Sequence, residues 1–372
     1  MLKYGYIHFK YRHMSVIKLP NAYLSREVYK GFIDQDHFLV RLEEVFDWHA
    51  LSAPLSDLGD NDHGGRPRHA SRLMLKMLFV SFLFNLSDRD TEFTATNNLL
   101  VKYFLGLPID EKAPDHTSLC RFRETVLMKK GILFFDTLFR SLTEQAKDRG
   151  IVFSTIQALD ATHTLANVDE RKPQDRKTPR DPDASWGCKG DETKVTRDGQ
   201  KVQIPKFFFG YKAHLTAETS HGFITGIHTT GGHVADIDGG DWLIHRVMTK
   251  EERSGLNVLL ADKGYGCPVW INCLEKYTGV MTAFSLPLTM TRRGEHQKKW
   301  VAYYHEDEGR KAFRRDRYVI ERVNGDLKDH HGLRRSRYLG GIKYHLQTVM
   351  ASLCHNVKIA MRLLTGMRLK PI

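Results

Sequence analysis

Cysteine is scarce in this sequence, and its spacing argues against two kinds of site. The chain of 372 residues contains five cysteines, an odd number, and no two of them form a Cys-x2-Cys pair. Such a pattern argues against a disulfide framework and against a structural zinc site. We therefore expect free thiols in a reducing compartment. The five are Cys120, Cys188, Cys267, Cys273 and Cys354.

Long hydrophobic runs and nucleotide-binding motifs are also missing. No stretch of about 18 uncharged apolar residues occurs, as a membrane-spanning helix would require. The first residues carry charge throughout and lack the apolar segment of a secretory signal. Neither Gly-x4-Gly-Lys-Ser/Thr nor Gly-x-Gly-x2-Gly is present, so no nucleotide cofactor is expected. The sequence predicts a cytoplasmic protein without a membrane partner.

Positive charge is what the chain has in excess. Lysine and arginine number 56 against 44 aspartates and glutamates, which gives a net charge of +12. A basic surface favours polyanions, because each neutralised phosphate releases condensed counterions. Acidic membranes or ribosomal RNA would satisfy this charge as well as DNA would. The charge alone therefore predicts only an anionic partner.

The spacing of apolar residues separates an N-terminal helical region from a C-terminal mixed region. Residues 1–33 show no clear periodicity and are interpreted as an arm. Residues 34–149 place apolar side chains at steps of three and four, which predicts helices, including one over residues 91–105. A further helix is predicted to begin near Thr117 or Ser118 and to carry Arg121 and Arg123. This region is interpreted as a DNA-binding or dimerisation domain, although plain helical packing explains the same pattern.

Residues 150–372 combine short apolar strands with helices. Three strands, a helix, a strand, a helix, a strand and further helices follow one another, which predicts a mixed α/β sheet flanked by helices. The polar residues at about 166–204 are interpreted as a surface loop or small insertion, and residues 291–308 as a loop. The strands are expected over 156–159, 207–215, 223–230, 257–261 and 280–285.

Two of the predicted strands end in aspartate, at Asp160 and Asp262. Functional groups collect at the carboxyl ends of strands in open α/β sheets. A single aspartate in such a place is more often a turn or cap residue. The pair gains significance only together with a third carboxylate that can reach it.

Glu321 is the candidate for that third carboxylate. At helical spacing it shares one face with the cations at positions 314, 317 and 328, and with Asn324. An apolar stripe at positions 320, 323 and 327 can pack against the sheet. The alternative is a solvated helix face with ion pairs, each contributing roughly a few tenths of a kcal/mol.

These residues resemble the motifs of bacterial insertion-sequence DDE transposases. Arg317-x3-Glu321-x6-Lys328 is similar to the Tyr-x2-Arg-x3-Glu-x6-Lys motif of that family, with Arg314 where the family has tyrosine. The segments 159–162 (Leu-Asp-Ala-Thr) and 261–265 (Ala-Asp-Lys-Gly-Tyr) resemble those that carry the two family aspartates. The resemblance extends into the N-terminal helical region and covers roughly residues 34–364.

The resemblance implies an RNase H-like fold and a two-metal enzyme. Asp160, Asp262 and Glu321 would hold two divalent ions, Mg²⁺ or Mn²⁺, which prefer hard oxygen ligands. It further implies nicking of double-stranded DNA at terminal inverted repeats, followed by attack of the freed 3′-hydroxyl on target DNA. Because two ends must be joined, we expect a homodimer associated with the nucleoid. The three carboxylates alone imply only metal-dependent phosphoryl transfer.

Basic residues near these carboxylates are the candidates for DNA binding. Arg317 and Lys328 would hold phosphates, as arginine forks and lysine point charges commonly do. His163 is an auxiliary site residue or a structural histidine, and Trp300 is a candidate for stacking on a base. The full set of predicted DNA-binding residues is Arg314, Arg317, Lys328, Arg334, Arg335, Arg337, Lys298, Lys299, Arg121 and Arg123.

Three other functions stay open at this point. An RNase H-like nuclease would use the same carboxylates without strand transfer, but the Arg-x3-Glu-x6-Lys helix and the helical N-terminal region favour a transposase. A catalytically inactive DNA-binding protein derived from a transposase is disfavoured, because all three carboxylates are present. A basic RNA-binding module would need an aromatic RNA-recognition motif or a Gly-x2-Gly loop in a suitable context, and neither is found.

Overall fold

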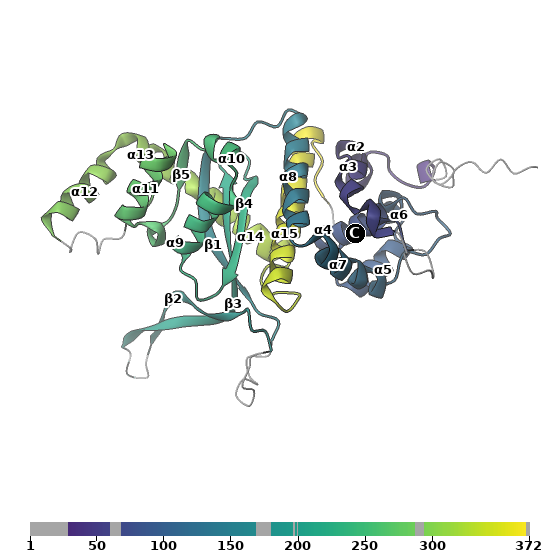
Figure 1. Ribbon diagram of the computed structural model, residues 1–372, viewed down its shortest axis with the longest axis horizontal. Helices are drawn as coiled ribbons and strands as arrows, with labels where there is room; N and C mark the ends of the chain where they lie inside the picture. Colours follow the sequence, from purple (N-terminus) through teal and green to yellow (C-terminus); the bar gives the residue numbers. More distant parts are fainter. Residues whose placement is uncertain are drawn as a thin grey trace, which may run out of the picture.

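The chain folds into a helical region and a sheet region that lie side by side (Figure 1). The computed structural model describes residues 29–59, 68–168, 180–195, 198, 200–286 and 294–369. Between residues 38 and 148 the regular elements described are helices, and the first strand begins at Ile156. No helix in these described ranges is long and apolar enough to cross a lipid bilayer.

Side-chain caps set the limits of several helices in the first region. Asn98 accepts hydrogen bonds from the backbone N–H groups that follow it, so the helix predicted over residues 91–105 is two helices with a break at Asn98. Asp115 caps α7 by accepting from the N–H of Ser118 at 2.6 Å, in place of the predicted Thr117 or Ser118. The elements are α2 (Phe38–Val45), α3 (Trp48–Ser52), η1 (Ala53–Gly59), α4 (Ser71–Leu83), α5 (Asp88–Asn97), α6 (Leu99–Leu105), α7 (His116–Lys130) and α8 (Leu133–Asp148).

The second region is built on one mixed sheet with the strand order β2-β3-β1-β5-β6, and β4 also pairs with β3. β1, β3 and β4 are antiparallel neighbours, whereas β1, β5 and β6 run parallel. This is the predicted RNase H-like α/β sheet flanked by helices. Its strands are β1 (Ile156–Leu165), β2 (Ser185–Val195), β3 (Lys201–Glu218), β4 (Ile224–Gly231), β5 (Val258–Leu260) and β6 (Met281–Thr282).

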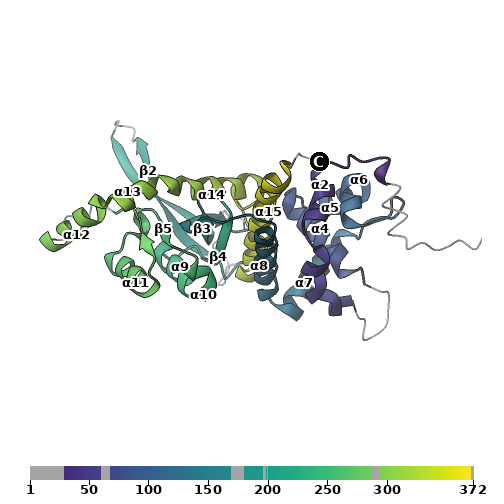
Figure 2. The same cartoon turned by 90° about the horizontal axis from the view of Figure 1, so that it is seen from above.

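Helices cover both faces of this sheet, and α12, α13 and α14 follow one another toward α15 (Figure 2). α14 packs against β1 and β3 on one face, and α9 packs against β1, β3 and β4 on the other. The elements are α9 (Asp236–Trp242), η2 (Leu243–Val247), α10 (Lys250–Ser254), η3 (Lys263–Tyr265), α11 (Pro268–Thr278), α12 (Glu295–Glu306), α13 (Glu308–Arg314), η5 (Arg315–Arg317), α14 (Tyr318–His330) and α15 (Gly341–Thr365).

Helix α15 joins the two regions through a continuous core. It lies between the sheet and the N-terminal helices and packs against β4, α8 and α4. Residues 346–357 of α15 are buried on every side, and the same hydrophobic cluster includes the buried side chains of α4 and β3. Several of the buried polar side chains of α15 have partners, as where Asn356 pairs with the backbone of Ile224 and Gln347 donates to the carbonyl of Gly332. Because one core serves both regions, the predicted division near residue 150 stays a prediction.

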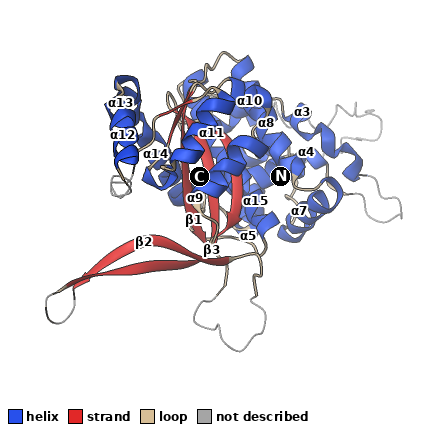
Figure 3. Ribbon diagram, turned by 60° about the vertical axis from the view of Figure 1, so that its left-hand side comes forward, coloured by secondary structure: helices blue, strands red, loops and turns tan. Residues whose placement is uncertain are grey.

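Two segments predicted as loops have regular structure. Within residues 166–204, β2 and the start of β3 form a two-stranded ribbon that projects from the body (Figure 3). Within residues 291–308, residues 295–306 form α12. Polar composition concealed both, because the ribbon has no apolar face toward the core and α12 buries only a few side chains, among them Val301 and Tyr304. Residues 169–179, 196–197, 199 and 291–293 of these segments lie outside the described residues.

The predicted N-terminal arm lies mostly outside the described residues, which begin at Tyr29. Tyr29 itself is buried, and its hydroxyl donates to the carbonyl of Leu107 at 2.9 Å. Residues 29–33 therefore pack against the helical region. The prediction of an arm over residues 1–28 concerns residues that the structure does not describe.

A half-buried carboxylate, Asp326, fixes α14 on α15. His355 of α15 hydrogen-bonds Asp326 at 2.6 Å, and Lys358 of α15 approaches it at 3.0 Å. Burial alone would raise the pKa of Asp326, but hydrogen bonds from His331 and His355 and the charge of Lys358 hold this pKa well below its usual range. The ionised carboxylate therefore stabilises the packing of α14 against α15.

We predict that Asp326→Asn destabilises the protein at pH 7 by about 3 kcal/mol, because it leaves the partners of a paired carboxylate uncompensated. The folded-state pKa of Asp326 lies below the unfolded value, so its stabilisation is present above the unfolded pKa and is lost as the pH falls through the acid range. Thermal denaturation measured from pH 8 to pH 3 should show that the variant is less stable than the wild type. This difference in stability should narrow below about pH 4.

Asp329→Asn, on the same helix and more exposed, serves as the matched control and should change stability little. An equal loss of stability in both variants, or a deficit for Asp326→Asn that does not depend on pH, would contradict this role of Asp326.

Candidate active site

Asp160 and Asp262 lie close to each other, just beyond the last residue pair of two parallel strands. Ala158 of β1 is paired with Leu260 of β5, and each aspartate follows two residues beyond this pair. Asp262 follows the end of β5, but β1 continues to Leu165, so Asp160 lies in the middle of its strand and not at the predicted strand end. The charge of Asp262 acts on Asp160, which agrees with the closeness of the two carboxyl groups. Asp262 also accepts from the N–H of Gly264 at 2.8 Å, which starts the turn η3. The structure thus places two of the three predicted carboxylates together.

The surroundings of Asp160 make its negative charge costly. Burial raises the pKa of Asp160 to about 7, the backbone N–H of Ala161 lowers it, and the nearby charge of Asp262 raises it further. Arg317 is close enough to oppose this rise. The amide of Asn324 donates to Asp160 Oδ2 at 2.8 Å. A buried carboxylate that lies beside another negative charge is stabilised when a cation binds next to it.

A third acid near Asp160 is Asp236, which the sequence allows as a supplementary acid, although its context favours a turn, cap or surface role. Asp236 begins α9, and Lys212 of β3 donates to its Oδ1 at 2.7 Å. Close packing of α9 on the sheet brings it there, because a Cβ at Gly239 would lie 2.1 Å from the ring of His214. The charge of Asp236 contributes to the raised pKa of Asp160. The sequence signal was an aspartate in the connection between a predicted strand and helix.

The hydroxyl of Tyr265 lies among these three acids. It is buried and has no hydrogen-bond partner among the described residues. Burial and the charges of Asp160, Asp236 and Asp262 raise the pKa of Tyr265 well above its usual range. An unpartnered polar atom beside several carboxylates marks a place where a bound ion or water could complete the contacts.

Glu321, the third predicted carboxylate, is paired with Arg317 on the surface of the helix. Its side chain is 56% exposed and accepts from Arg317 at 2.6 Å, an i,i+4 ion pair on the helix surface. This is the solvated ion pair that the spacing also allowed. No group of three histidine, cysteine, aspartate or glutamate side chains in the described ranges is arranged to hold a metal ion.

Asn324, one turn after Glu321, is the side chain of α14 that contacts Asp160. Its Oδ1 is buried and has no partner in the described part of the chain. The sequence already placed Asn324 on the same helical face as Glu321. It was not chosen as a site residue because a neutral amide is not a typical catalytic group. The donor set around Asp160 consists of hard oxygens, which suits Mg²⁺ or Mn²⁺.

Lys328 lies near Asp160 on the next turn of α14. Burial lowers the pKa of Lys328 to about 8, the charge of Lys189 lowers it further, and Asp160 opposes this. Lys328 and Arg317 are thus close to Asp160, as the sequence predicted. Their contact with DNA stays a prediction.

Four other predicted DNA-binding arginines differ in what they contact. Arg314 donates to the carbonyl of Tyr304 at 3.2 Å and packs over its ring, so it holds α13 to α12. Arg337 donates to the carbonyl of Leu86 at 3.0 Å and to Asn85, which links the two regions. Arg335 donates to backbone carbonyls at positions 166 and 168. Arg334 is exposed beside Asp329. Packing contacts therefore engage Arg314, Arg335 and Arg337, whereas Arg334 stays exposed.

In α7, Arg121 and Arg123 have different environments. Arg121 is exposed, whereas Arg123 is 3% exposed. Arg123 forms two hydrogen bonds with Asp88, at 3.1 and 3.2 Å, and stacks over the ring of Tyr338. Arg123 is therefore a packing residue between α5, α7 and the connection that precedes α15, and the DNA-binding prediction keeps only Arg121 in this helix.

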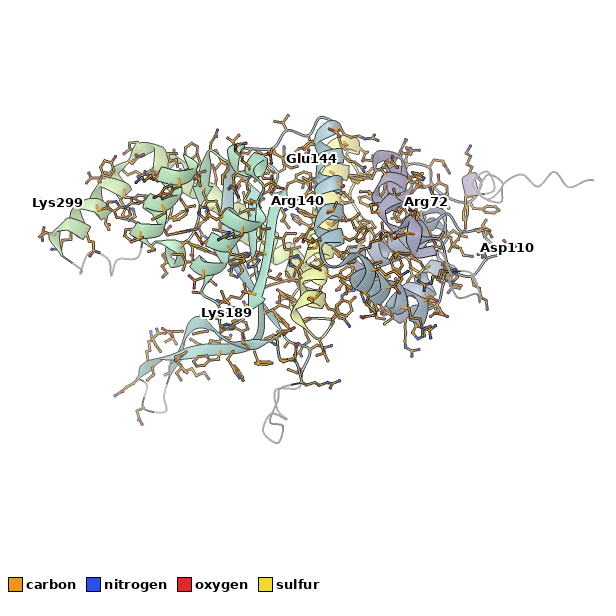
Figure 4. The ribbon with its side chains drawn as sticks, in the orientation of Figure 1. Arg72, Asp110, Arg140, Glu144, Lys189 and Lys299 are labelled. Carbon is orange, nitrogen blue, oxygen red and sulfur yellow. The ribbon has the colours of Figure 1, made fainter. Side chains whose placement is uncertain are left out.

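The cations predicted on a loop, Lys298 and Lys299, lie on α12 and are exposed at its end (Figure 4). Lys298 pairs with Glu295 at 2.8 Å. Trp300 stacks on Tyr304 with ring centroids 5.2 Å apart, so it is engaged in packing rather than free to wedge between bases.

His163 lies near the site on β1, and its ring is 5.0 Å from that of Phe208. Burial lowers the pKa of His163 to about 4, and the charges of Lys328, Lys189 and Lys206 act in the same direction. It is therefore neutral at pH 7.

Two models of known protein families match the chain. One, described as Transposase domain (DUF772), matches residues 27–125. The other, described as Transposase DDE domain, matches residues 153–357, more than half of the chain. The second match spans Asp160, Asp262 and Glu321.

We predict that Asp160→Asn stabilises the metal-free protein. The folded-state pKa of Asp160 is raised to about 7, so ionisation in the folded state destabilises the fold as the pH rises from the unfolded value toward 7. The variant should melt at a higher temperature than the wild type at pH 8 in EDTA, and this gain should disappear near pH 4.

Asp191→Asn, which changes an exposed aspartate of β2, is the control and should leave the melting temperature unchanged at both pH values. A lower melting temperature of Asp160→Asn at pH 8 would show that the charge of Asp160 is well solvated.

Proposed function

Because the chain belongs to the family of DDE transposases, we propose that it cuts the ends of an insertion sequence and joins the freed 3′-hydroxyl to target DNA. The family makes it a transposase that acts on DNA. The residues proposed for the chemistry are Asp160, Asp262 and Glu321. The proposed DNA partners are the terminal inverted repeats of the element and a target duplex.

The observation that carries this proposal is the closeness of Asp160 and Asp262, which follow the last residue pair of the neighbouring parallel strands β1 and β5. A buried carboxyl whose pKa is raised to about 7, beside a second carboxylate, is an arrangement that tight packing alone does not favour. Perturbed groups of this kind are concentrated at functional sites. An edge with two acids and an arginine nearby suits phosphoryl transfer better than any other reaction of DNA.

Divalent metal is proposed as the cofactor, held by Asp160 and Asp262, with Glu321 completing the set. Glu321 would join them by exchanging its ion pair with Arg317 for the metal, and Arg317 would then be available to a phosphate. Bound Mg²⁺ or Mn²⁺ supplies charge neutralisation on the attacking and leaving oxygens of the phosphodiester. Asn324 keeps Asp160 oriented through its amide hydrogen bond.

Arg317 and Lys328 are proposed to position the DNA backbone beside Asp160. Arginine presents a fixed fork that matches two phosphate oxygens, and lysine acts as a point charge. Lys328 has a pKa of about 8 in the protein alone, and a phosphate nearby would favour its charged form. The two side chains stand on either side of Glu321 along α14, so they would approach the strand from both sides of the reacting phosphate.

A homodimer is proposed, because two transposon ends must be joined in one reaction. The region at residues 34–149 is proposed to bind the ends or to form the dimer, and Arg121 is its exposed candidate for DNA contact. Both roles rest on the family and on charge rather than on an interface seen here.

A second candidate function is a DNA-binding protein without catalytic activity. The net charge of +12 supports DNA binding of this kind, which requires no catalytic carboxylates. An RNase H-like nuclease without strand transfer is the remaining alternative, and the same experiment separates all three.

We predict metal-dependent nicking of a labelled duplex that carries the terminal sequence of the element. With Mg²⁺ or Mn²⁺ the wild type should cut at the end and join the product to a supercoiled plasmid. Asp160→Ala and Glu321→Ala should each lower the rate by at least about 10³-fold, since several kcal/mol of transition-state stabilisation depend on the metal ligands. Binding of the duplex, measured by gel shift, should persist.

Glu308→Ala, which removes an exposed carboxylate from the neighbouring α13, should retain full activity. Cutting without joining would identify a nuclease. Binding without cutting by the wild type in either metal would identify an inactive DNA-binding protein. Cutting that survives both alanine substitutions would show that the carboxylates are assigned wrongly.

A further inference from the structure

The ribbon formed by β2 and the first half of β3 has little contact with the rest of the molecule (Figure 3). All residues from 188 to 195 on β2, and from 201 to 207 on β3, are exposed. A two-stranded ribbon of this kind is marginally stable by itself, and its exposed surface is available to a partner. The side chains at its base differ from those farther out.

A β-bulge at the base of the ribbon brings two lysines opposite each other. Cys188 pairs with Phe207 and Asp191 pairs with Pro205, so the extra residue of β2 falls between these pairs. Lys189 and Gly190 therefore lie opposite Lys206. Gly190 has φ of +87°, a conformation that glycine adopts without strain. Bulges of this kind re-aim side chains and are frequent beside active sites.

These two lysines lie close to the candidate active site. Lys189 stands where the ribbon joins the body (Figure 4). Its charge acts on Lys328 of α14, and the charges of Lys189, Lys206 and Lys328 all act on the ring of His163. The three lysines thus surround one position at the sheet edge, although they come from β2, β3 and α14.

The three lysines also lack ion-pair partners among the residues that the structure describes. In the part of the chain that the structure describes, none of the three forms an ion pair, whereas neighbouring Lys212 is paired with Asp236. Cations held near one another without counter-charges repel, and a polyanion is the partner that removes this repulsion. We name Lys189, Lys206 and Lys328 the ribbon-base cluster.

We propose that the ribbon-base cluster binds the phosphate backbone of the DNA strand that leads into the active site, so that Lys189 and Lys206 extend the track begun by Lys328. This inference rests on the proposed function and adds to it two positioning residues on an element outside α14. The contacts are to phosphates, so they fix the position of the strand and read no base sequence. Neutral His163 stands between the cations without adding charge.

Two features favour DNA over a protein partner for this base. The side chains gathered there are cationic and unpaired, and the cluster continues from Lys328, which stands beside the proposed reacting centre. If an acidic protein surface or a second copy of the ribbon occupied the base of the ribbon, it would also keep DNA away from the same edge of the sheet. We therefore treat a protein contact as an outcome of the test.

The test measures the salt dependence of binding to a short fluorescent duplex of arbitrary sequence in EDTA, where no cleavage occurs. Lys189→Ala/Lys206→Ala should reduce the slope of log K against log salt by about 2, since each phosphate contact contributes about 0.9. Affinity near 0.1 M salt should fall on the order of 50-fold. The conservative variant Lys189→Arg/Lys206→Arg should keep both the slope and the affinity of the wild type.

The matched control is Lys194→Ala/Lys201→Ala, which removes two exposed lysines from the outer part of the same ribbon. Its slope should stay within about 0.5 of the wild type. Circular dichroism and gel filtration of each variant establish that the fold and the oligomeric state are unchanged.

The outcomes are distinct. If the wild type binds no duplex, the proposed function fails. If the wild type binds and the Lys189→Ala/Lys206→Ala protein keeps its slope, only the ribbon-base cluster is overturned. An equal loss of slope in the Lys194→Ala/Lys201→Ala control overturns the cluster as well, because removing any two positive charges from the ribbon would then have the same effect. A change of oligomeric state without a change in slope would assign the base to a protein contact.

Discussion

The arrangement of the candidate site depends on how Asp326 fixes α14. This carboxylate is held by His355 and Lys358 of α15, and its low pKa keeps it charged. The same helix carries Asn324 to Asp160 and places Lys328 near the base of the ribbon. A turn or slip of α14 would move all of these groups at once. Ion pairs inside a protein contribute little net stability, but they can select one register among several.

Around this helix the charges are separated by sign. Asp160, Asp262 and Asp236 lie close together, and the lysines of the ribbon-base cluster gather along the neighbouring edge. Each group is unfavourable for the isolated protein, because like charges repel one another. Burial adds to this cost for Asp160 and for Lys328. A bound metal would relieve the repulsion among the three aspartates, and a nucleic-acid backbone would relieve the repulsion among the three lysines. Violations of ordinary packing rules are expected where a protein meets its ligands.

Strong local patterns in the sequence were sufficient to predict the sheet and much of the site. Apolar strands that end in aspartate located Asp160 and Asp262, and the face of α14 placed Arg317 and Lys328 near Asp160. The ribbon and α12 were missed because both are largely polar, and the few apolar side chains that α12 buries, such as Val301 and Tyr304, were not recognised as a helical face. Asn324 was missed as a contact of Asp160, and Asp236 was considered but not chosen, because their roles depend on contacts between distant segments. The buried states of Arg123 and Arg337 were missed for the same reason, since a charged residue can be satisfied by partners far along the chain.

The position of α15 has a consequence for how the protein is made. This helix fills the interior between α4, in the helical region, and β4, in the sheet, yet it follows both of them in the chain. Neither region can complete its core until α15 has left the ribosome. Contacts between such distant segments form slowly, and the apolar surfaces that α15 will cover are exposed to aggregation and to chaperones. Both regions therefore complete their folding only after α15 has been synthesised.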